Sequence, residues 1–286
     1  MVSPWSPSLS LIHKWPAREY YLTGQVICWR HCNILQRDLD RLQAWEATWD
    51  MEFNPSKCTV MNITRSKSPF LSKYTLHGQT LETVKEAKYL GVTISNDLSW
   101  NSHINQISTK AGQTLNFLKR NIPSKNQKVR EFAYKSLVRP KLEYACSVWS
   151  PHTQQNTHKL EMVQRRAARW VKHDYSSYSS VTSMINSLHW RLLEHRRLDA
   201  RLCMFYKIVY GLVAVPIPSY VIPPRRLSRN LHSLSFQPLH TVNNYYKYAF
   251  YPATIVLWNS LPLDMVQIPT LDHFKDALQN YNYIKP

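Results

Sequence analysis

Hydrophobic periodicity constrains the fold of this chain more than any other feature, because it becomes helical near residue 100 and stays so to residue 210. Over this stretch apolar residues recur at steps of three and four, and Pro140 is expected to kink or break one of the helices. Only 5 of the 286 residues are glycine, which argues against a turn-rich all-β fold. Helices are therefore predicted over residues 100–119, 126–149, 159–173 and 190–210.

The stretch before residue 100 has a different pattern, which predicts a small α+β unit over residues 33–99. Its first element is a helix over residues 33–48, where apolar residues again recur every three or four positions. Asn54-Pro55 is expected to end this helix, because proline disfavours α geometry in the residue before it. A short alternating strand is predicted to follow over residues 59–63.

One β-hairpin and a second β pattern are predicted in the second half of this unit. Residues 74–81 alternate around His77 and Gly78, which places the glycine where a hairpin turn requires a positive φ. Residues 88–94 give a second β pattern, in which Gly91 is expected to mark a bulge or a close backbone approach.

The net charge of +18 is concentrated in the predicted helices. Residues 100–210 hold 19 Lys and Arg against 6 Asp and Glu, whereas residues 33–99 hold 8 of each. A basic excess confined to one region is typical of a surface that binds a polyanion such as nucleic acid. The alternative interpretation is a solvated basic surface that only keeps the protein soluble.

The remaining regions carry weaker signals. A long uncharged run, residues 209–224, contains four prolines and is interpreted as a linker, not a membrane span. It leads into an aromatic tail with a short helix near residues 270–280. The 5 cysteines have irregular spacing, which predicts no disulfide framework and favours a reducing intracellular compartment, cytoplasmic or nuclear.

Neither a metal site nor a nucleophile is indicated by the cysteines and histidines. Cys28, His31 and Cys32 have a spacing compatible with zinc, but no second pair lies at a suitable distance. Glu194 and His195 lack the second histidine of a metalloprotease helix. Most tryptophans and tyrosines fall on apolar helix faces, so we interpret them as core residues in preference to base-stacking ones.

Several segments, in order, resemble one family. The runs LQRDLDRLQAWEATWDMEFNPSKCTVMNI, YTLHGQTLETVKEAKYLGVTIS, LVRPKLEYACSVWSPH, MVQRRAARWV and FYPATIVLWNSLP are similar to the C-terminal portion of reverse transcriptases. The type they resemble is that of non-LTR (LINE-type), jockey-like retrotransposons. The resemblance extends from about residue 33 to residue 278, and the order of the segments makes it specific.

The resemblance implies roles for particular residues. Asn54, Pro55 and Lys57 match a motif of the polymerase palm, whose lysine is thought to assist the departure of pyrophosphate as a general acid. The hairpin at Tyr89, Leu90 and Gly91 matches the primer grip, which holds the end of the growing strand. The helices after residue 100 would be the thumb, followed by the family's extension.

A basic thumb implies contacts with RNA or DNA, including an RNA–DNA hybrid, through phosphates and without sequence preference. Lys and Arg side chains of the predicted helices and their connections are the candidates for these contacts. Together with the hairpin residues above, they are Lys110, Lys119, Arg120, Lys125, Lys128, Arg165, Arg166, Arg169 and Lys172.

The chain departs from the family at its catalytic centre. The family uses paired carboxylates to hold the Mg²⁺ ions of two-metal chemistry, and the matching position reads Tyr-Tyr-Leu-Thr-Gly-Gln-Val over residues 20–26. No two acidic residues are adjacent anywhere in the chain. Asp38 and Asp40 lie on a helix, where they point about 200° apart. Lys57 is therefore interpreted as a remnant, and no bound metal cofactor is expected.

Together these features predict an α+β chain with five regions. They are an unpatterned segment (1–32), a palm remnant with the hairpin (33–99), thumb-like helices (100–150), a basic helical extension (151–210) and a Pro-rich linker with an aromatic tail (211–286). The predicted function is that of a truncated, catalytically inactive reverse transcriptase fragment that binds RNA or DNA and no membrane. The alternatives are a non-catalytic protein-interaction module and the product of a decayed transposon.

Overall fold

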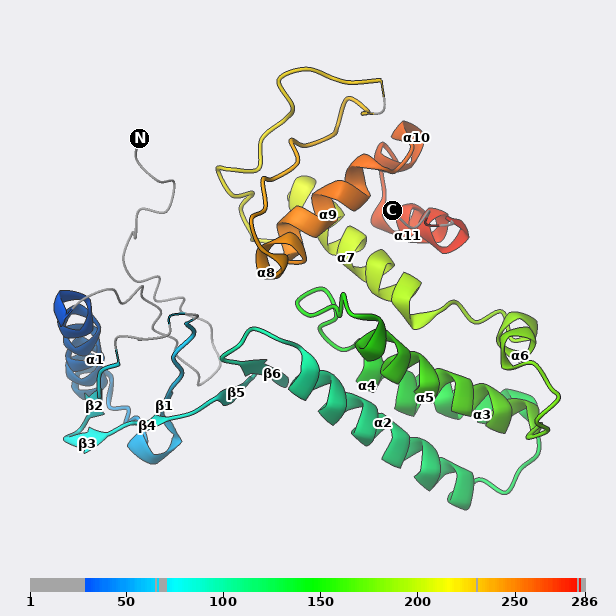
Figure 1. Ribbon diagram of the computed structural model, residues 1–286, viewed down its shortest axis with the longest axis horizontal. Coiled ribbons are helices and arrows are strands. Elements are labelled where there is room, and N and C mark those ends of the chain that lie inside the picture. Colours follow the sequence, from blue (N-terminus) through cyan, green and yellow to red (C-terminus); the bar gives the residue numbers. More distant parts are fainter. Residues whose placement is uncertain (1–28, 65, 67–70, 230, 282, 284–286) are drawn as a thin grey trace. The chain divides into compact units, whose positions relative to one another are not determined.

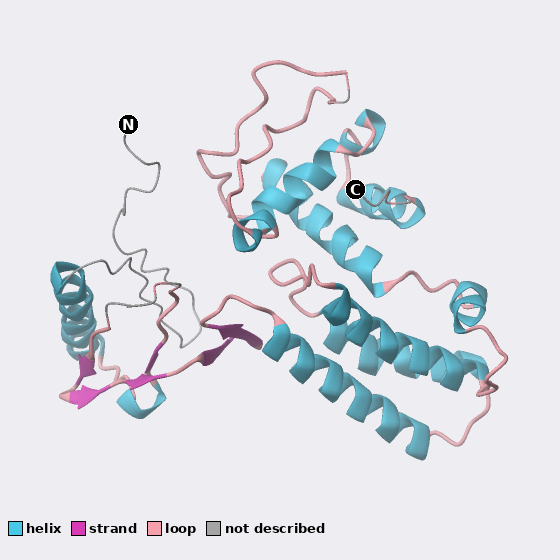
Figure 2. Cartoon of the chain, viewed as in Figure 1, coloured by secondary structure: helices cyan, strands magenta, loops and turns pink. Residues whose placement is uncertain are grey.

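The chain divides into two compact units, residues 1–99 and residues 100–286. The computed structural model describes residues 29–64, 66, 71–229, 231–281 and 283. Short strands and one long helix make up the described part of the first unit, and helices joined by loops make up that of the second (Figure 2). The predicted α+β class is confirmed. Residues 1–28, which include Cys28 and the run 20–26, lie outside the described residues.

Helix α1 spans Trp29–Trp49 and so begins four residues before the predicted start. The prediction that Asn54-Pro55 ends it was wrong. Asp50 adopts a left-handed conformation (φ 50°), and the Met51 N–H donates to the Glu46 carbonyl at 3.2 Å. This Schellman-type cap satisfies the last carbonyls of the helix before the proline is reached.

The strands of the first unit are short and pair two by two (Figure 1). The predicted hairpin and the second β pattern are confirmed as antiparallel pairs. The predicted strand 59–63 is shorter than expected, with only its first two residues in a parallel pair, in the register Thr59↔Glu82. The strands are β1 (Thr59–Val60), β2 (Thr75–Leu76), β3 (Gln79–Thr80), β4 (Glu82–Thr83), β5 (Glu86–Tyr89) and β6 (Val92–Ser95).

Both hairpins turn through two residues with positive φ, which defines the type I′ turn. His77 and Gly78 have φ of 49° and 73°, and Leu90 and Gly91 have φ of 44° and 84°. Gly91 is therefore a turn residue, and the bulge considered for it is absent, since β5 and β6 pair in register from Tyr89↔Val92 outward.

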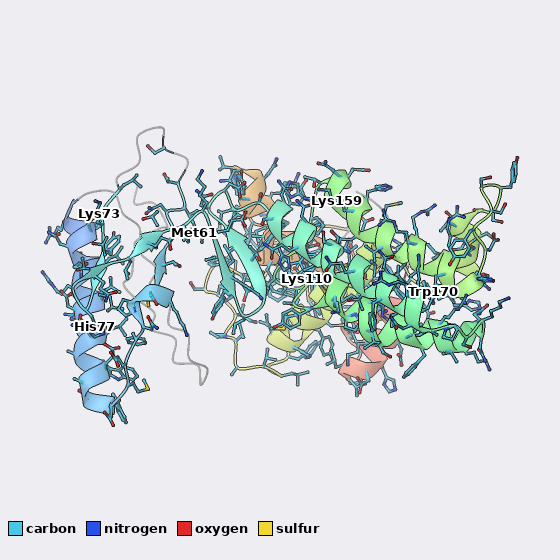
Figure 3. All side chains as sticks on the ribbon, turned by 90° about the horizontal axis from the view of Figure 1, so that it is seen from below. Met61, Lys73, His77, Lys110, Lys159 and Trp170 are labelled. Atoms are coloured by element: carbon cyan, nitrogen blue, oxygen red, sulfur yellow. The ribbon has the colours of Figure 1, made fainter. Side chains whose placement is uncertain are left out.

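A buried carboxylate holds the first unit together. Glu46 on α1 is only 3% exposed, and its Oε1 accepts the Phe53 N–H. Its Oε2 lies 2.9 Å from Nε2 of His77, at the β2–β3 turn. Figure 3 labels His77. Beside this carboxylate, Tyr74, Leu76 and Leu81 form a small apolar cluster against α1. The carboxylate thus links the helix, the loop after it and the hairpin.

The second unit begins with four helical segments followed by the long helix α5, and α5 packs beside the first of them, α2. Pro140 lies at the start of α4, which continues directly from the segment before it. The segment before it, η2, is a π-helix, so the predicted break at Pro140 takes the form of a widened turn. The elements are α2 (Asn101–Asn121), α3 (Gln127–Ala133), η2 (Tyr134–Val138), α4 (Arg139–Glu143) and α5 (Gln154–Lys172).

An aromatic core organises the C-terminal half of the second unit. Trp258 and Phe274 are fully buried against Phe205 of α7, and the Trp258 Nε1–H donates to the Leu234 carbonyl at 3.0 Å. The proline-rich linker packs on the same core through Val221, and the predicted helix near 270–280 is confirmed as α11. The elements are α6 (Val181–Ser187), α7 (Leu193–Val209), α8 (Asn244–Lys247), α9 (Phe250–Asn259), α10 (Leu263–Val266) and α11 (Leu271–Asn280).

The inward faces of two helices carry arginines at positions where apolar residues would be usual. Val129, Phe132 and Leu137 of the α3–η2 segment are apolar but 45–73% exposed. Arg130 occupies the inward position instead, where its guanidinium donates to the Trp170 carbonyl at 2.8 Å and lies 5.6 Å from the Trp170 ring centroid. A long side chain with an aromatic partner and a carbonyl partner can be buried although it is charged.

On α7 the exception is larger. Arg197 and Arg201 are charged, yet they are only 2% and 5% exposed. Burial lowers the pKa of both guanidinium groups, to about 10 for Arg201. The apolar positions of α7 gave no sign that the two arginines lie inside.

Candidate nucleic-acid interface

The palm-like corner at Lys57 is a short 3-10 helix, η1 (Pro55–Lys57). Asn54 caps it, since its side-chain oxygen accepts the Ser56 N–H at 3.0 Å and the Ser56 hydroxyl at 2.6 Å. Lys57 is the last residue of η1 and is exposed. The motif is thus preformed and holds Lys57 at the surface just before β1.

No set of carboxylates gathers for a metal among the described residues. In those ranges no group of three or more His, Cys, Asp or Glu side chains is placed to hold an ion. Asp38 is 8% exposed and pairs with Arg41 at 3.1 Å, whereas Asp40 is exposed and accepts from Gln36. The two aspartates therefore point to different sides of α1 and do not fit a shared metal.

The predicted primer-grip residues form the tip of the β5–β6 hairpin. Leu90 is 49% exposed and Gly91 is exposed, both in the turn, whereas Tyr89 at the end of β5 is half-buried. The turn therefore presents an apolar side chain and accessible backbone to the surroundings.

The basic helices α2 and α5 lie side by side in the second unit, held by polar contacts near their N-terminal ends. Asn156 Nδ2 donates to Asn101 Oδ1 at 2.6 Å, and the Lys159 ammonium donates to Asn105 Oδ1 at 2.8 Å. Figure 3 labels Lys159 and Lys110, one on each helix. Lys159 was not among the predicted site residues, although its position seven residues before Arg166 places it on the same side of α5.

Two of the predicted cations on these helices lie close enough to repel each other. Lys119 of α2 is half-buried, and Arg166 of α5 is exposed. Burial, and then the positive charge of Arg166, lower the pKa of the Lys119 ammonium. A positive potential that disfavours a proton on a lysine favours a bound anion at the same place.

Arg165 and Arg169 lie one helical turn apart on α5 and are held by the segment that follows it. An Arg165 Nη1–H donates to the Thr182 hydroxyl at 3.4 Å, and an Arg169 Nη1–H donates to the Ser176 carbonyl at 2.9 Å. Together with Arg166 they line a hollow of about 490 Å³ between α5, α6 and the start of α7.

The other predicted cations do not all share one surface. Lys110 and Lys119 are nine positions apart, which places them on opposite sides of α2 by the helical period. Arg120, Lys125 and Lys128 are exposed around the α2–α3 connection. The structure thus brings Lys119 and Arg166 together, whereas Lys110 lies on the opposite side of α2.

Three of the 6 acidic residues in residues 100–210 form ion pairs with basic residues outside the predicted set. Glu143 accepts from Arg196, Glu131 lies 2.6 Å from Lys135, and Asp199 lies 2.9 Å from Arg191. None of the nine Lys and Arg side chains predicted to contact phosphates in residues 110–172, all of them described, forms an ion pair within the described part of the chain.

Three curated proteins match the chain in sequence. They are a probable RNA-directed DNA polymerase from transposon BS of Drosophila melanogaster (25% identical over 57% of this chain) and the RNA-directed DNA polymerases from mobile element jockey of Drosophila funebris (31% over 49%) and Drosophila melanogaster (29% over 48%). The matched regions cover only 18%, 15% and 15% of those proteins. No protein-family model and no solved structure matches the chain.

These matches show what the chain is similar to: RNA-directed DNA polymerases of mobile elements, over about half of its length. Among these proteins, the two jockey polymerases confirm the resemblance to the jockey-like type. The four described cysteines, Cys32, Cys58, Cys146 and Cys203, are free thiols. None of the described helices combines the length and apolar character that crossing a membrane requires.

Proposed function

We propose that the helical unit binds RNA or DNA, with an RNA–DNA hybrid as its preferred test ligand, through phosphate contacts that carry no sequence preference. One observation carries the proposal: among the described residues, the nine predicted cations of α2, α5 and their connections form no ion pair, while Glu131, Glu143 and Asp199 pair with other basic residues. Lysines and arginines left without carboxylates are available to replace the counterions of a polyanion.

The test is a binding titration of a labelled RNA–DNA hybrid over a series of salt concentrations. Affinity should fall linearly with salt on logarithmic axes, with a slope set by the number of phosphates contacted. Scrambling the sequence of the hybrid should leave the affinity unchanged. No binding at low salt, or an affinity that does not respond to salt, overturns the proposal.

We further propose that this chain does not polymerise nucleotides by itself. Support comes from the sequence, which has no adjacent acidic pair, and from Asp38 and Asp40, which point to different sides of α1. Lys57 and the β5–β6 tip would then be remnants of a palm and a primer grip. A primer-extension assay with Mg²⁺ or Mn²⁺ tests this, and any templated extension by the pure chain refutes it.

A protein-interaction role is the second candidate, and one observation favours it. Val129, Phe132 and Leu137 present an exposed apolar surface on the α3–η2 segment, with Phe132 73% exposed. Substituting Phe132→Ser should abolish self-association or partner binding through this surface and leave hybrid binding intact. The protein-interaction role is contradicted if the chain is monomeric both with and without the substitution and if the substitution abolishes no partner binding.

A further inference from the structure

The hollow between α5, α6 and α7 has a cationic side and an aliphatic side. A surface that contacts only phosphates does not need the aliphatic side. One side carries the guanidinium groups of α5, and the other carries aliphatic side chains of α6 and of the residue before α7. Its volume of about 490 Å³ lies in the range of roughly 300–1,000 Å³ typical of small-ligand pockets. The residues that matter are Arg165, Arg166, Arg169, Val181, Ile185 and Leu192.

The cationic side is preorganised. The Arg165 guanidinium donates to the Thr182 hydroxyl on α6, and the Arg169 guanidinium donates to the Ser176 carbonyl in the connection between α5 and α6. Arg166 is exposed, and no hydrogen bond or ion pair of a described residue engages its guanidinium. Two fixed guanidinium groups and a third that is available match the several oxygens of a phosphate.

The aliphatic side is built into the fold. Val181 and Ile185 are one helical turn apart on α6 and are 7% and 3% exposed, so they form a rigid wall. Leu192 is 40% exposed and extends this wall at the N-terminal end of α7. An aliphatic surface of this kind favours a flat, weakly hydrated ligand face next to the arginines.

The acid in the lining does not oppose an anion strongly. The Glu161 carboxylate accepts the Glu194 N–H at 2.8 Å, in the first turn of α7, so its charge interacts with that helix N-terminus. Burial raises the pKa of this carboxyl.

We propose that this hollow seats one unpaired nucleotide of a single-stranded segment, with its phosphate on the arginines of α5 and its base against Val181, Ile185 and Leu192. A base in a duplex is stacked and paired, and so it cannot reach the aliphatic wall. The inference deepens the proposed nucleic-acid binding and rests on it: it adds a preference for strands with free bases.

The experiment compares two labelled strands that carry the same phosphates. One is a short single strand of mixed sequence, and the other contains a run of abasic residues at its centre. The parent protein should bind the intact strand about fivefold more tightly. Leu192→Ser should remove this preference, because it deletes the exposed part of the wall at a position where serine suits a helix start.

Two controls separate the base contact from general effects. Leu212→Ser, at a leucine that is 57% exposed and outside the hollow, should keep the fivefold preference. Arg166→Gln should weaken both strands by a similar factor, since both carry the phosphate. Circular dichroism of each variant establishes that it is folded.

The outcomes distinguish the two proposals. Equal affinity of the parent protein for intact and abasic strands overturns the nucleotide seat, while salt-dependent binding of the hybrid still supports the proposed function. Retention of the preference in Leu192→Ser also overturns it. If neither strand nor hybrid binds at low salt, both proposals fail.

Discussion

Two groups of basic side chains in the helical unit have the same chemistry and opposite surroundings. Arg191 and Arg196, with Arg139, lie against Glu143 and Asp199, and the Arg196 guanidinium bonds Glu143 through two nitrogens. Lys119 and Arg166 face each other without an acid between them. The first group connects α4 with α7 through Glu143 and Arg196, and it connects Arg191, just before α7, with Asp199 on that helix. The second group leaves a positive surface on α2 and α5.

The difference teaches that a count of charges locates a polyanion site only roughly. The 19 Lys and Arg of residues 100–210 include residues that stabilise the fold and residues that remain for a ligand. The carboxylates that form ion pairs determine to which group a basic residue belongs, because each of them neutralises a particular neighbour. Substitutions in either group can therefore test this division.

The largest effect is expected at the paired group. Glu143→Ala leaves Arg196 and Arg139 without their shared carboxylate, and we expect the free energy of unfolding to fall by about 2–3 kcal/mol. This is below the value for a fully buried pair because the side chains of Arg196 and Glu143 are 33% and 21% exposed. Urea denaturation measures the change, and hybrid affinity should not fall. An unchanged stability would contradict the assigned role.

The second effect concerns a buried histidine on α2, near Lys110. Burial, followed by the charge of Lys110, lowers the pKa of His103 to about 4, and the Trp149 ring packs against it at 5.0 Å. The unfolded chain takes up this proton near pH 6.5, so the stability that the neutral ring contributes is present above that pH. It should be lost between about pH 6.5 and 4, amounting to roughly 2–3 kcal/mol.

The variant His103→Phe should flatten this part of the stability curve, measured by urea denaturation at a series of pH values. Carboxylates titrate in the same range, so the comparison is between variants and not between pH values. His240→Phe, at an exposed histidine, serves as the control and should keep the slope. A slope that persists in His103→Phe would show that other groups cause it.

The third effect is on binding. Replacing Lys119 and Arg166 together with glutamine should weaken the RNA–DNA hybrid about tenfold and reduce the salt slope by about 2, one for each phosphate that these side chains no longer neutralise. The matched control removes the same charge from paired lysines, Lys135→Gln with Lys275→Gln, which lie 2.6 Å from Glu131 and 2.9 Å from Asp272. An equal fall in affinity for the two double variants would erase the distinction between the groups.

The smallest effect is on stability at the unpaired group. Lys119→Gln removes a half-buried cation that Arg166 repels, so the free energy of unfolding should rise by roughly 0.2–0.5 kcal/mol. High salt should reduce the increase, because it screens the repulsion. Arg120→Gln, at an exposed neighbour, should give no such increase in thermal unfolding.

The sequence predicted the elements of this fold better than their faces. The hairpin at residues 74–81 followed from His77-Gly78, because a turn of two positive φ angles strongly favours glycine at its second position. Gly91 was expected to mark a bulge or a close backbone approach, and it lies instead in the turn of the second hairpin. The end of α1 was predicted to within one residue, but its cause is the left-handed conformation of Asp50 and not Asn54-Pro55. Sequence rules that predict two-residue turns are strong. Rules that predict which residue other than glycine ends a helix in the left-handed conformation are weaker.

Long-range partners explain what the sequence did not reveal about the candidate site. Glu46 is buried because Phe53 and His77 satisfy its carboxylate, and Arg130 is buried because Trp170 satisfies its guanidinium from 40 residues away. No periodicity encodes such pairs. The basic stripe of α5 was predictable from spacing alone, but the aliphatic wall beside it comes from α6, whose separate pattern gave no indication that it faces the arginines.

The π-helix Tyr134–Val138 bears on how this chain is aligned with its relatives. A π turn accommodates one residue more than the α turn that it replaces. A relative with a regular helix here would be one residue shorter, and the gap belongs inside residues 134–138. A gap placed later would shift Arg139, Leu142 and Glu143 by one position and assign the partner of Arg196 to the wrong column.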